Sequence, residues 1–114
     1  MADTVLRMVR GETKIVTGTI EQDGAALDIT GASIAFSVKW AYTDAANIFQ
    51  LTVGSGITVN SAPAGTVTIT IAASNTSTLP LSTVNLKYDI QLTEAGGNVY
   101  VVARGDLVVE PNVS

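Results

Sequence analysis

The chain contains neither cysteine nor histidine. These two absences exclude disulfides, thiol chemistry, the usual zinc sites and every acid or base that depends on an imidazole. Positive charge is scarce too, because only six of the 114 residues are lysine or arginine and the net charge is −4. Such a chain lacks the basic stripe that binds phosphate backbones, so we expect no nucleic-acid partner.

Long apolar runs are also missing. No run approaches the roughly 20 residues of a membrane-spanning helix, and no apolar core follows a basic start within residues 1–10. We therefore expect a soluble protein that is made in the cytoplasm and has no membrane partner. Hydrolysis by paired carboxylates is the one enzymatic mechanism that the composition permits, but most of the acids fall in expected turns or on solvent-facing strand positions. We expect no enzymatic activity, no catalytic residue, no cofactor and no bound metal.

Valine and threonine dominate what is present, and glycine, asparagine and serine separate the apolar runs, as is typical of strands and turns. Alternation of apolar and polar residues predicts half-buried strands over 33–42, 66–71 and 84–93. In the first of these, alternation assigns Trp40 and Tyr42 to the apolar, inward face. Weaker patterns predict further strands over 4–9, 13–21, 48–53, 57–60 and 98–109, the last of them broken near Gly105.

Glycine-containing turn sequences separate these segments at the intervals typical of hairpins. The sequence therefore predicts an all-β fold, an immunoglobulin-like antiparallel β-sandwich of about seven to eight strands in a single domain over residues 1–114. Residues 72–79 are the one helical candidate, a single turn capped by Ser74 or Asn75 and ended by Pro80.

Two segments depart from the alternation because they are apolar on both faces. One contains Val5, Leu6, Met8 and Val9, and the other runs from Val99 to Val102. A sandwich buries one face of each strand, so the second face requires a partner or another cover. Two interpretations stay open: an edge used for contact, or end strands that curl over the opening of the sandwich. If the edge is used for contact, the expected interface residues are Val5, Leu6, Met8, Tyr100 and Val102.

Two short motifs have alternative interpretations. Arg104-Gly105-Asp106 spells an integrin-recognition tripeptide, but three residues recur by chance, and a bulge or kink at Gly105 explains the glycine as well. Asp23 and Asp28 lie in expected turns that would offer oxygen ligands to calcium. Their spacing matches no EF-hand loop, and turn carboxylates more often bond their own backbone.

The run from Leu27 to Lys39, LDITGASIAFSVK, leads from an aspartate through threonine, glycine and alanine into an expected strand. Later segments follow in order at 56–59, 64–71, 73–80, 88–93 and 105–111. Together these segments resemble the N-terminal domain of phage baseplate upper proteins, over about residues 10–113. The resemblance implies a β-sandwich that attaches a receptor-binding or fibre protein to a phage tail.

The resemblance thus implies a structural bacteriophage virion protein, an adaptor or accessory protein of the tail or baseplate. The sequence ends at Ser114 without the downstream helical or fibre region of that family, which favours a free-standing adaptor. We expect location in the virion, other virion proteins as partners, and assembly as a homo-oligomer or symmetric array. Two alternatives stay open: a capsid decoration protein, and a carbohydrate-binding module that uses Trp40, Tyr42, Tyr88 and Tyr100 for stacking.

Overall fold

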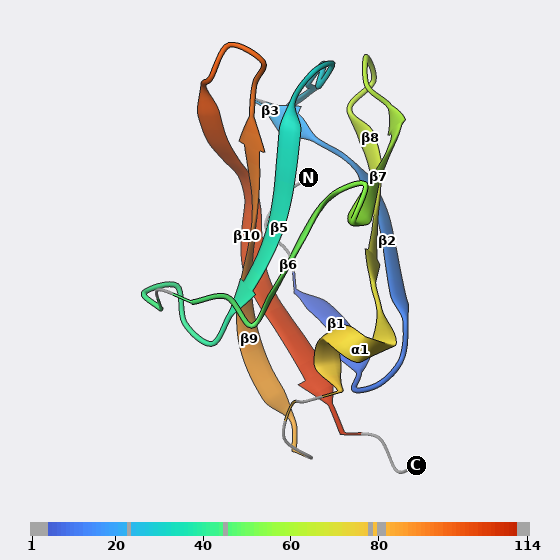
Figure 1. Ribbon diagram of the computed structural model, residues 1–114, viewed down its shortest axis with the longest axis vertical. Coiled ribbons are helices and arrows are strands. Elements are labelled where there is room, and N and C mark those ends of the chain that lie inside the picture. Colours follow the sequence, from blue (N-terminus) through green and yellow to red (C-terminus); the bar gives the residue numbers. More distant parts are fainter. Residues whose placement is uncertain (1–4, 23, 45, 78, 80–81, 112–114) are drawn as a thin grey trace.

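The computed structural model describes residues 5–22, 24–44, 46–77, 79 and 82–111, and is nearly all β (Figure 1). One eight-stranded sheet, in the order β1-β10-β9-β5-β6-β7-β8-β2, curls until it is nearly closed. Its strands are β1 (Leu6–Val9), β2 (Lys14–Thr19), β5 (Ser33–Lys39), β6 (Phe49–Val53), β7 (Gly56–Ser61), β8 (Thr66–Ile71), β9 (Val84–Thr93) and β10 (Val99–Glu110). A separate two-stranded ribbon is formed by β3 (Glu21–Gln22) and β4 (Ala25–Ala26).

The strands with the clearest alternation are confirmed, and β8 and β9 match their predicted ranges to the residue. The segment predicted over 33–42 is shorter, because β5 ends at Lys39. A tight turn follows, in which the Asp44 amide donates to the Ala41 carbonyl over 3.0 Å and the Asp44 carboxylate accepts from the Ala41 amide. The assignment of Trp40 to the buried face is therefore wrong: its side chain is 48% exposed, and Tyr42 lies in the same loop.

Most neighbouring strands are antiparallel, as predicted, but two pairs are not. β1 runs parallel to β10, from Leu6 opposite Leu107 to Val9 opposite Glu110. β6 and β7 make a two-residue parallel contact at the turn between them, where the sheet crosses from one half to the other. The prediction of a wholly antiparallel sheet is wrong at these two places. In the parallel register of β1, Met8 lies opposite Val109 and its side chain is in the core.

Strand β10 is continuous, so the predicted break near Gly105 is also wrong. The irregularity is a bulge three residues earlier, because Val101 lies opposite Gln91 while Ala103 already lies opposite Ile90. The extra residue, Val102, shifts the alternation by one position. This shift explains why residues 99–102 are apolar at consecutive positions: the inward residue is Tyr100 before the bulge and Ala103 after it.

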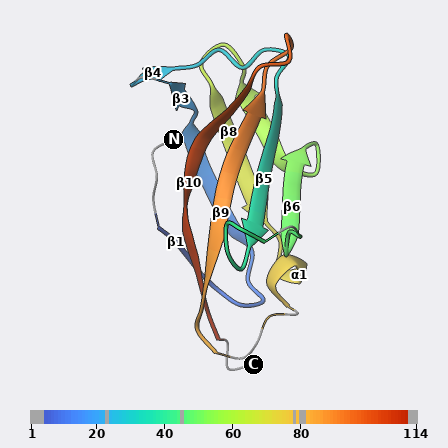
Figure 2. The same cartoon turned by 90° about the vertical axis from the view of Figure 1, so that its left-hand side faces the viewer.

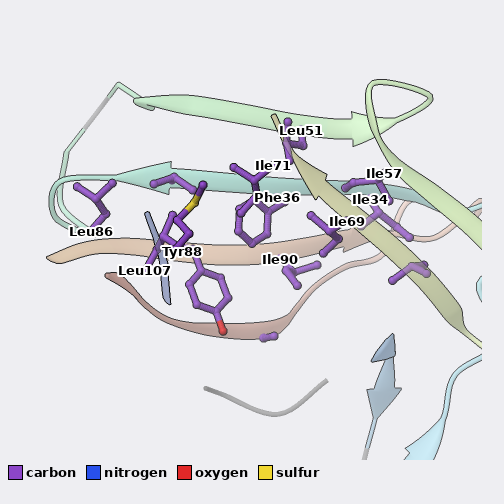
Figure 3. Close-up of a cluster of buried hydrophobic side chains, with 14 of the residues drawn as sticks. Ile34, Phe36, Leu51, Ile57, Ile69, Ile71, Leu86, Tyr88, Ile90 and Leu107 are labelled. Carbon is purple, nitrogen blue, oxygen red and sulfur yellow. The ribbon is translucent and has the colours of Figure 1, made fainter. Parts of the chain in front are cut away.

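The core lies between the two halves of the curled sheet, where side chains of β5, β9 and β10 meet those of β8 (Figure 3). The rings of Phe36 and Tyr88 stack at its centre, with centroids 5.3 Å apart. At one end, Gly65 has a φ of +70°, and a Cβ there would lie 2.5 Å from the Leu27 carbonyl oxygen. Only glycine tolerates both this conformation and this close approach.

The predicted helical turn is present as α1 (Ala73–Thr76), which is shorter than the range 72–79. The N-cap residue is Ala72, so the prediction that Ser74 or Asn75 occupies that position is wrong. Asn75, three residues later, instead accepts from the Ala72 amide through its side-chain oxygen over 2.8 Å. Pro80 lies outside the described residues. In the part of the chain that the structure describes, no helix is long and apolar enough to cross a membrane.

Candidate functional site

The sheet stays open between its two edge strands, β1 and β2 (Figure 2). These strands follow each other in the chain, but β1 pairs with β10 and β2 pairs with β8. The turn between them is fixed to α1, because the Gly11 amide donates to Thr76 Oγ1 over 3.0 Å and Arg10 Nε donates to the Leu79 carbonyl over 2.9 Å. From this anchored turn the two strands diverge.

The divergence leaves a cleft of about 410 Å³, which we term the seam groove. Its floor consists of core side chains, Phe36, Ile69, Tyr88 and Ile90. One wall is formed by Leu6 and Ala103, and the other by residues 16–19 of β2 with Glu21. A mainly apolar cleft of this size lies in the range of sites that bind ligands or chain segments.

Small residues on both walls leave space between the walls of the groove. Gly18 lies directly opposite Val67 of β8, whose side chain is fully buried, so position 18 faces the inside of the sheet. A larger residue there would project into the groove, whereas glycine leaves it open. On the other wall Ala103 contributes only a methyl group at an inward position that is 2% exposed.

Both walls are also strand edges. Within the described residues, β2 has β8 as its one ladder partner. The described ladder between β1 and β10 ends at Leu107, so among the described residues β9 is the one strand that pairs with residues 99–103 of β10. An edge of this kind presents backbone groups that readily pair with another strand. Beside it, the outward side chains of Val99 and Val101 are 52% and 54% exposed.

The five predicted interface residues lie along the same side of the sheet, but not on one surface. Leu6 lines the groove, and Val5 is exposed just before β1. Met8 is only 3% exposed, so its side chain belongs to the core and is not available to a partner of the folded chain. Tyr100 and Val102 are half-buried against the core, and Val102 is the bulge residue.

Sequence reasoning did not assign Val16, Gly18 or Ala103 to a site. A signal was present in β2, because Gly18 alternates with the apolar Val16 and Ile20 and so shares their inward face. A glycine at an inward strand position marks either a close approach or a space. Ala103 had no comparable signal, since its inward orientation depends on the bulge at Val102.

A second cluster lies on the outer face of the sheet, around the triplet Arg104-Gly105-Asp106. The Tyr42 hydroxyl donates to the Gly105 carbonyl over 3.0 Å, and the Arg104 guanidinium carbon lies 5.7 Å from the Tyr42 ring centroid. Lys87 Nζ bonds Asp106 Oδ1 over 2.5 Å, and this hydrogen bond holds the pKa of the Asp106 carboxyl below its usual value. The triplet is thus part of strand β10, and each of its residues has an intramolecular contact.

The carboxylate of Asp28, in the turn before β5, accepts hydrogen bonds from a neighbouring residue of the same turn. Asp28 Oδ1 accepts from the Thr30 amide over 3.0 Å and from the Thr30 hydroxyl over 2.6 Å. These hydrogen bonds lower the pKa of the Asp28 carboxyl, and the bond from the Thr30 hydroxyl has the larger effect. Asp23 lies outside the described residues, and among those described no three acids come together as a metal site.

The aromatic residues considered for sugar stacking do not form one platform. Tyr88 is buried beneath the groove, and Tyr100 is half-buried on β10. Trp40 and Tyr42 remain, both about half exposed on the loop after β5. The cation of Arg104 lies over the ring of Tyr42, which restricts that ring further.

No protein-family model matches this chain, and no curated protein matches it either.

Proposed function

We propose that this chain is a non-enzymatic structural protein that binds other proteins through the open side of its sheet. The observation that carries the proposal is the seam groove, in which an apolar floor lies between two strand edges. Half-exposed valines on the outer face of β10 extend the apolar surface beyond the groove. Apolar patches and open edges are the features by which sheets associate with other chains.

The finer form of the fold that we propose is an immunoglobulin-like sandwich. The order β2-β8-β7 corresponds to strands B, E and D of that fold, and β10-β9-β5-β6 corresponds to G, F, C and C′. In the constant-type arrangement a further strand, A, pairs with strand B. Here the first strand, β1, lies on β10 instead, so no described strand pairs with the corresponding edge of β2.

The biological setting that we propose is the bacteriophage virion, as an adaptor or accessory protein of the tail or baseplate. The resemblance to baseplate upper proteins supports it, and its segments fall on the central elements: 27–39 leads into β5, and 88–93 lies in β9. In a virion, many identical weak interfaces act together, so each copy needs only modest affinity. A capsid decoration protein is the alternative within the same class.

Quantitative mass spectrometry of purified phage particles tests the setting, by counting copies of this chain per copy of the portal protein. A few to a few dozen copies indicate the tail or baseplate, whereas hundreds indicate a capsid decoration protein. Absence of the chain from the particles would contradict the virion proposal.

Self-association tests the exposed valines separately from the setting. We expect Val101→Lys to shift the sedimentation coefficient of the purified protein towards the monomer, because it places a charge in the apolar strip of β10. Gln91→Lys is the matched control, since Gln91 lies directly opposite Val101 on the same outer face and is already polar. Equal behaviour of the two variants would exclude the strip as a contact between copies.

A carbohydrate-binding module is the second candidate, and the exposure of Trp40 and Tyr42 on one loop favours it. Aromatic rings offer apolar faces for stacking, and these two have about half of their surface in solvent. A glycan array distinguishes the candidates: specific binding that is lost in Trp40→Ala would support this function, and a flat array would remove it.

A further inference from the structure

We propose that the seam groove receives an extended β-strand donated by a different protein, with apolar side chains at alternate positions. This inference rests on the proposed function and deepens it by naming the chemistry of the partner. It starts from one observation: among the described residues no strand lies between β2 and the upper half of β10 (residues 99–103), and the seam groove lies at that point.

The strand edges specify the backbone of the occupant. Residues 14–18 of β2 and residues 99–103 of β10 have a ladder partner on one side within the described chain. An occupant that satisfies such edges must offer its own amide and carbonyl groups at strand spacing, as an extended peptide does and a lipid or sugar does not. The pairings from strand to strand around the sheet show that β2 and β10 run in opposite directions. A donated strand that lies between them is therefore parallel to one of the two and antiparallel to the other.

The contact of β1 with β10 shows what this edge accepts. β1 has the sequence Leu-Arg-Met-Val and covers the lower half of the edge, with Met8 in the core and Arg7 exposed. Leu6, the first residue of that ladder, is also a wall residue of the groove. The groove therefore continues an established strand contact upwards, and a strand that follows β1 along β10 meets the same inward apolar environment.

The walls and floor specify the side chains of the occupant. The floor is formed by Phe36, Ile69, Tyr88 and Ile90, so every second side chain of the donated strand must be apolar. The small residues Gly18 and Ala103 leave room for large aliphatic groups. Among the described residues Glu21 is the one charged residue lining the groove, which places a lysine or arginine of the partner at that end.

The test uses an array of ten-residue peptides with alternating apolar and polar residues and one terminal lysine. A matched set has the same compositions in shuffled order. We expect the purified wild-type chain to bind the alternating set at least tenfold more strongly than the shuffled set. Equal binding of the two sets, or no binding to either, would overturn the proposal.

Two variants locate the binding. Gly18→Ile fills the groove from the inward side of β2, and the φ of Gly18 lies outside the left-handed region, so the variant is expected to fold. Thr70→Ile is the control, because Thr70 lies between two buried isoleucines of β8 and hence on the outer face. We expect at least a tenfold loss of peptide binding in Gly18→Ile and none in Thr70→Ile, with unchanged circular dichroism in both. Equal binding by the two variants would overturn the proposal.

Sedimentation of the same variants identifies the donor. If Gly18→Ile abolishes self-association of the chain, a second copy donates the strand, and the assignment to a different protein is overturned. If the peptide array fails while Val101→Lys still dissociates the oligomer, the strand proposal alone is lost. The proposed assembly function would then remain, because Val101 lies on the outer face and not in the groove.

Discussion

The two halves of β10 have similar apolar compositions but differ in burial and in strand pairing. In the lower half, β1 pairs with residues 107–110, and Leu107 and Val109 are fully buried. In the upper half, residues 99–103, no strand pairs with this edge within the described residues; the inward Tyr100 is only half-buried, and Val99 and Val101, on the outer face, are half exposed. The difference does not come from hydrophobicity, since both halves are valine-rich. It has two causes: β1 lies along the edge of the lower half only, and Val99 and Val101 face outwards whereas Leu107 and Val109 face inwards.

The junction between the halves is fixed by two features. The bulge at Val102 shifts the inward alternation, and bulges locally increase the bend and twist of a strand. Just below it, Tyr42 crosses from the loop after β5 and bonds the Gly105 carbonyl, while Arg104 lies over its ring. The upper half is thus held in a defined position although its edge is open. A preformed edge lowers the ordering cost of binding a strand.

The largest expected effect separates the halves by stability. Leu107→Ala removes a fully buried side chain from the lower half and leaves a cavity, so we expect it to lower the free energy of unfolding by about 2–5 kcal/mol. Val101→Ala, in the exposed half, should change it by no more than about 0.5 kcal/mol. Urea denaturation followed by circular dichroism measures both. Similar losses in the two variants would mean that the outer face of the upper half is covered in solution.

A smaller effect is expected at the junction. Tyr42→Phe removes the hydroxyl that bonds the Gly105 carbonyl, and this single bond should contribute about 0.5–1.5 kcal/mol to the free energy of unfolding. The substitution keeps the ring and its contact with Arg104. Trp40→Phe, on the same loop and without a hydrogen bond to β10 among those described, is the control. If the two variants are equally stable, the Tyr42 bond does not fix the position of β10.

Much of the sheet was predictable, because alternation follows directly from which face of a strand is buried. It identified the central strands β5, β8 and β9 and the inward position of Tyr88. It predicted a β5 that is too long, because Trp40 and Tyr42 continue the alternation of apolar and polar residues. In the structure, the hydrogen bonds between Asp44 and Ala41 form a turn there instead. A local hydrogen bond of this kind competes with strand pairing and leaves no trace in hydrophobic periodicity.

The candidate site was less predictable. The apolar residues at both ends of the chain drew attention to β1 and β10, but Met8 is in the core because β1 pairs in parallel with a strand about 100 residues later. Such a long-range pairing is not encoded in local pattern. The groove is a space between β2 and β10, so its walls include residues, such as Gly18, whose contribution is the absence of a side chain.

The smallest expected effect concerns the charge pair on the outer face below the bulge. Because the hydrogen bond from Lys87 lowers the pKa of Asp106 in the folded state, the ionised carboxylate favours the folded protein. This contribution is present above the unfolded-state pKa of about 3.9 and is lost as the pH falls through the lower folded-state value. Asp106→Asn should therefore lower the melting temperature slightly at pH 7 and hardly at all near pH 2. Asp89→Asn, at an acid of the neighbouring strand β9 that forms no ion pair among the described residues, provides the comparison in the same melting experiment. A melting-temperature difference between wild type and Asp106→Asn that does not shrink on acidification would show that the effect of this side chain is not electrostatic.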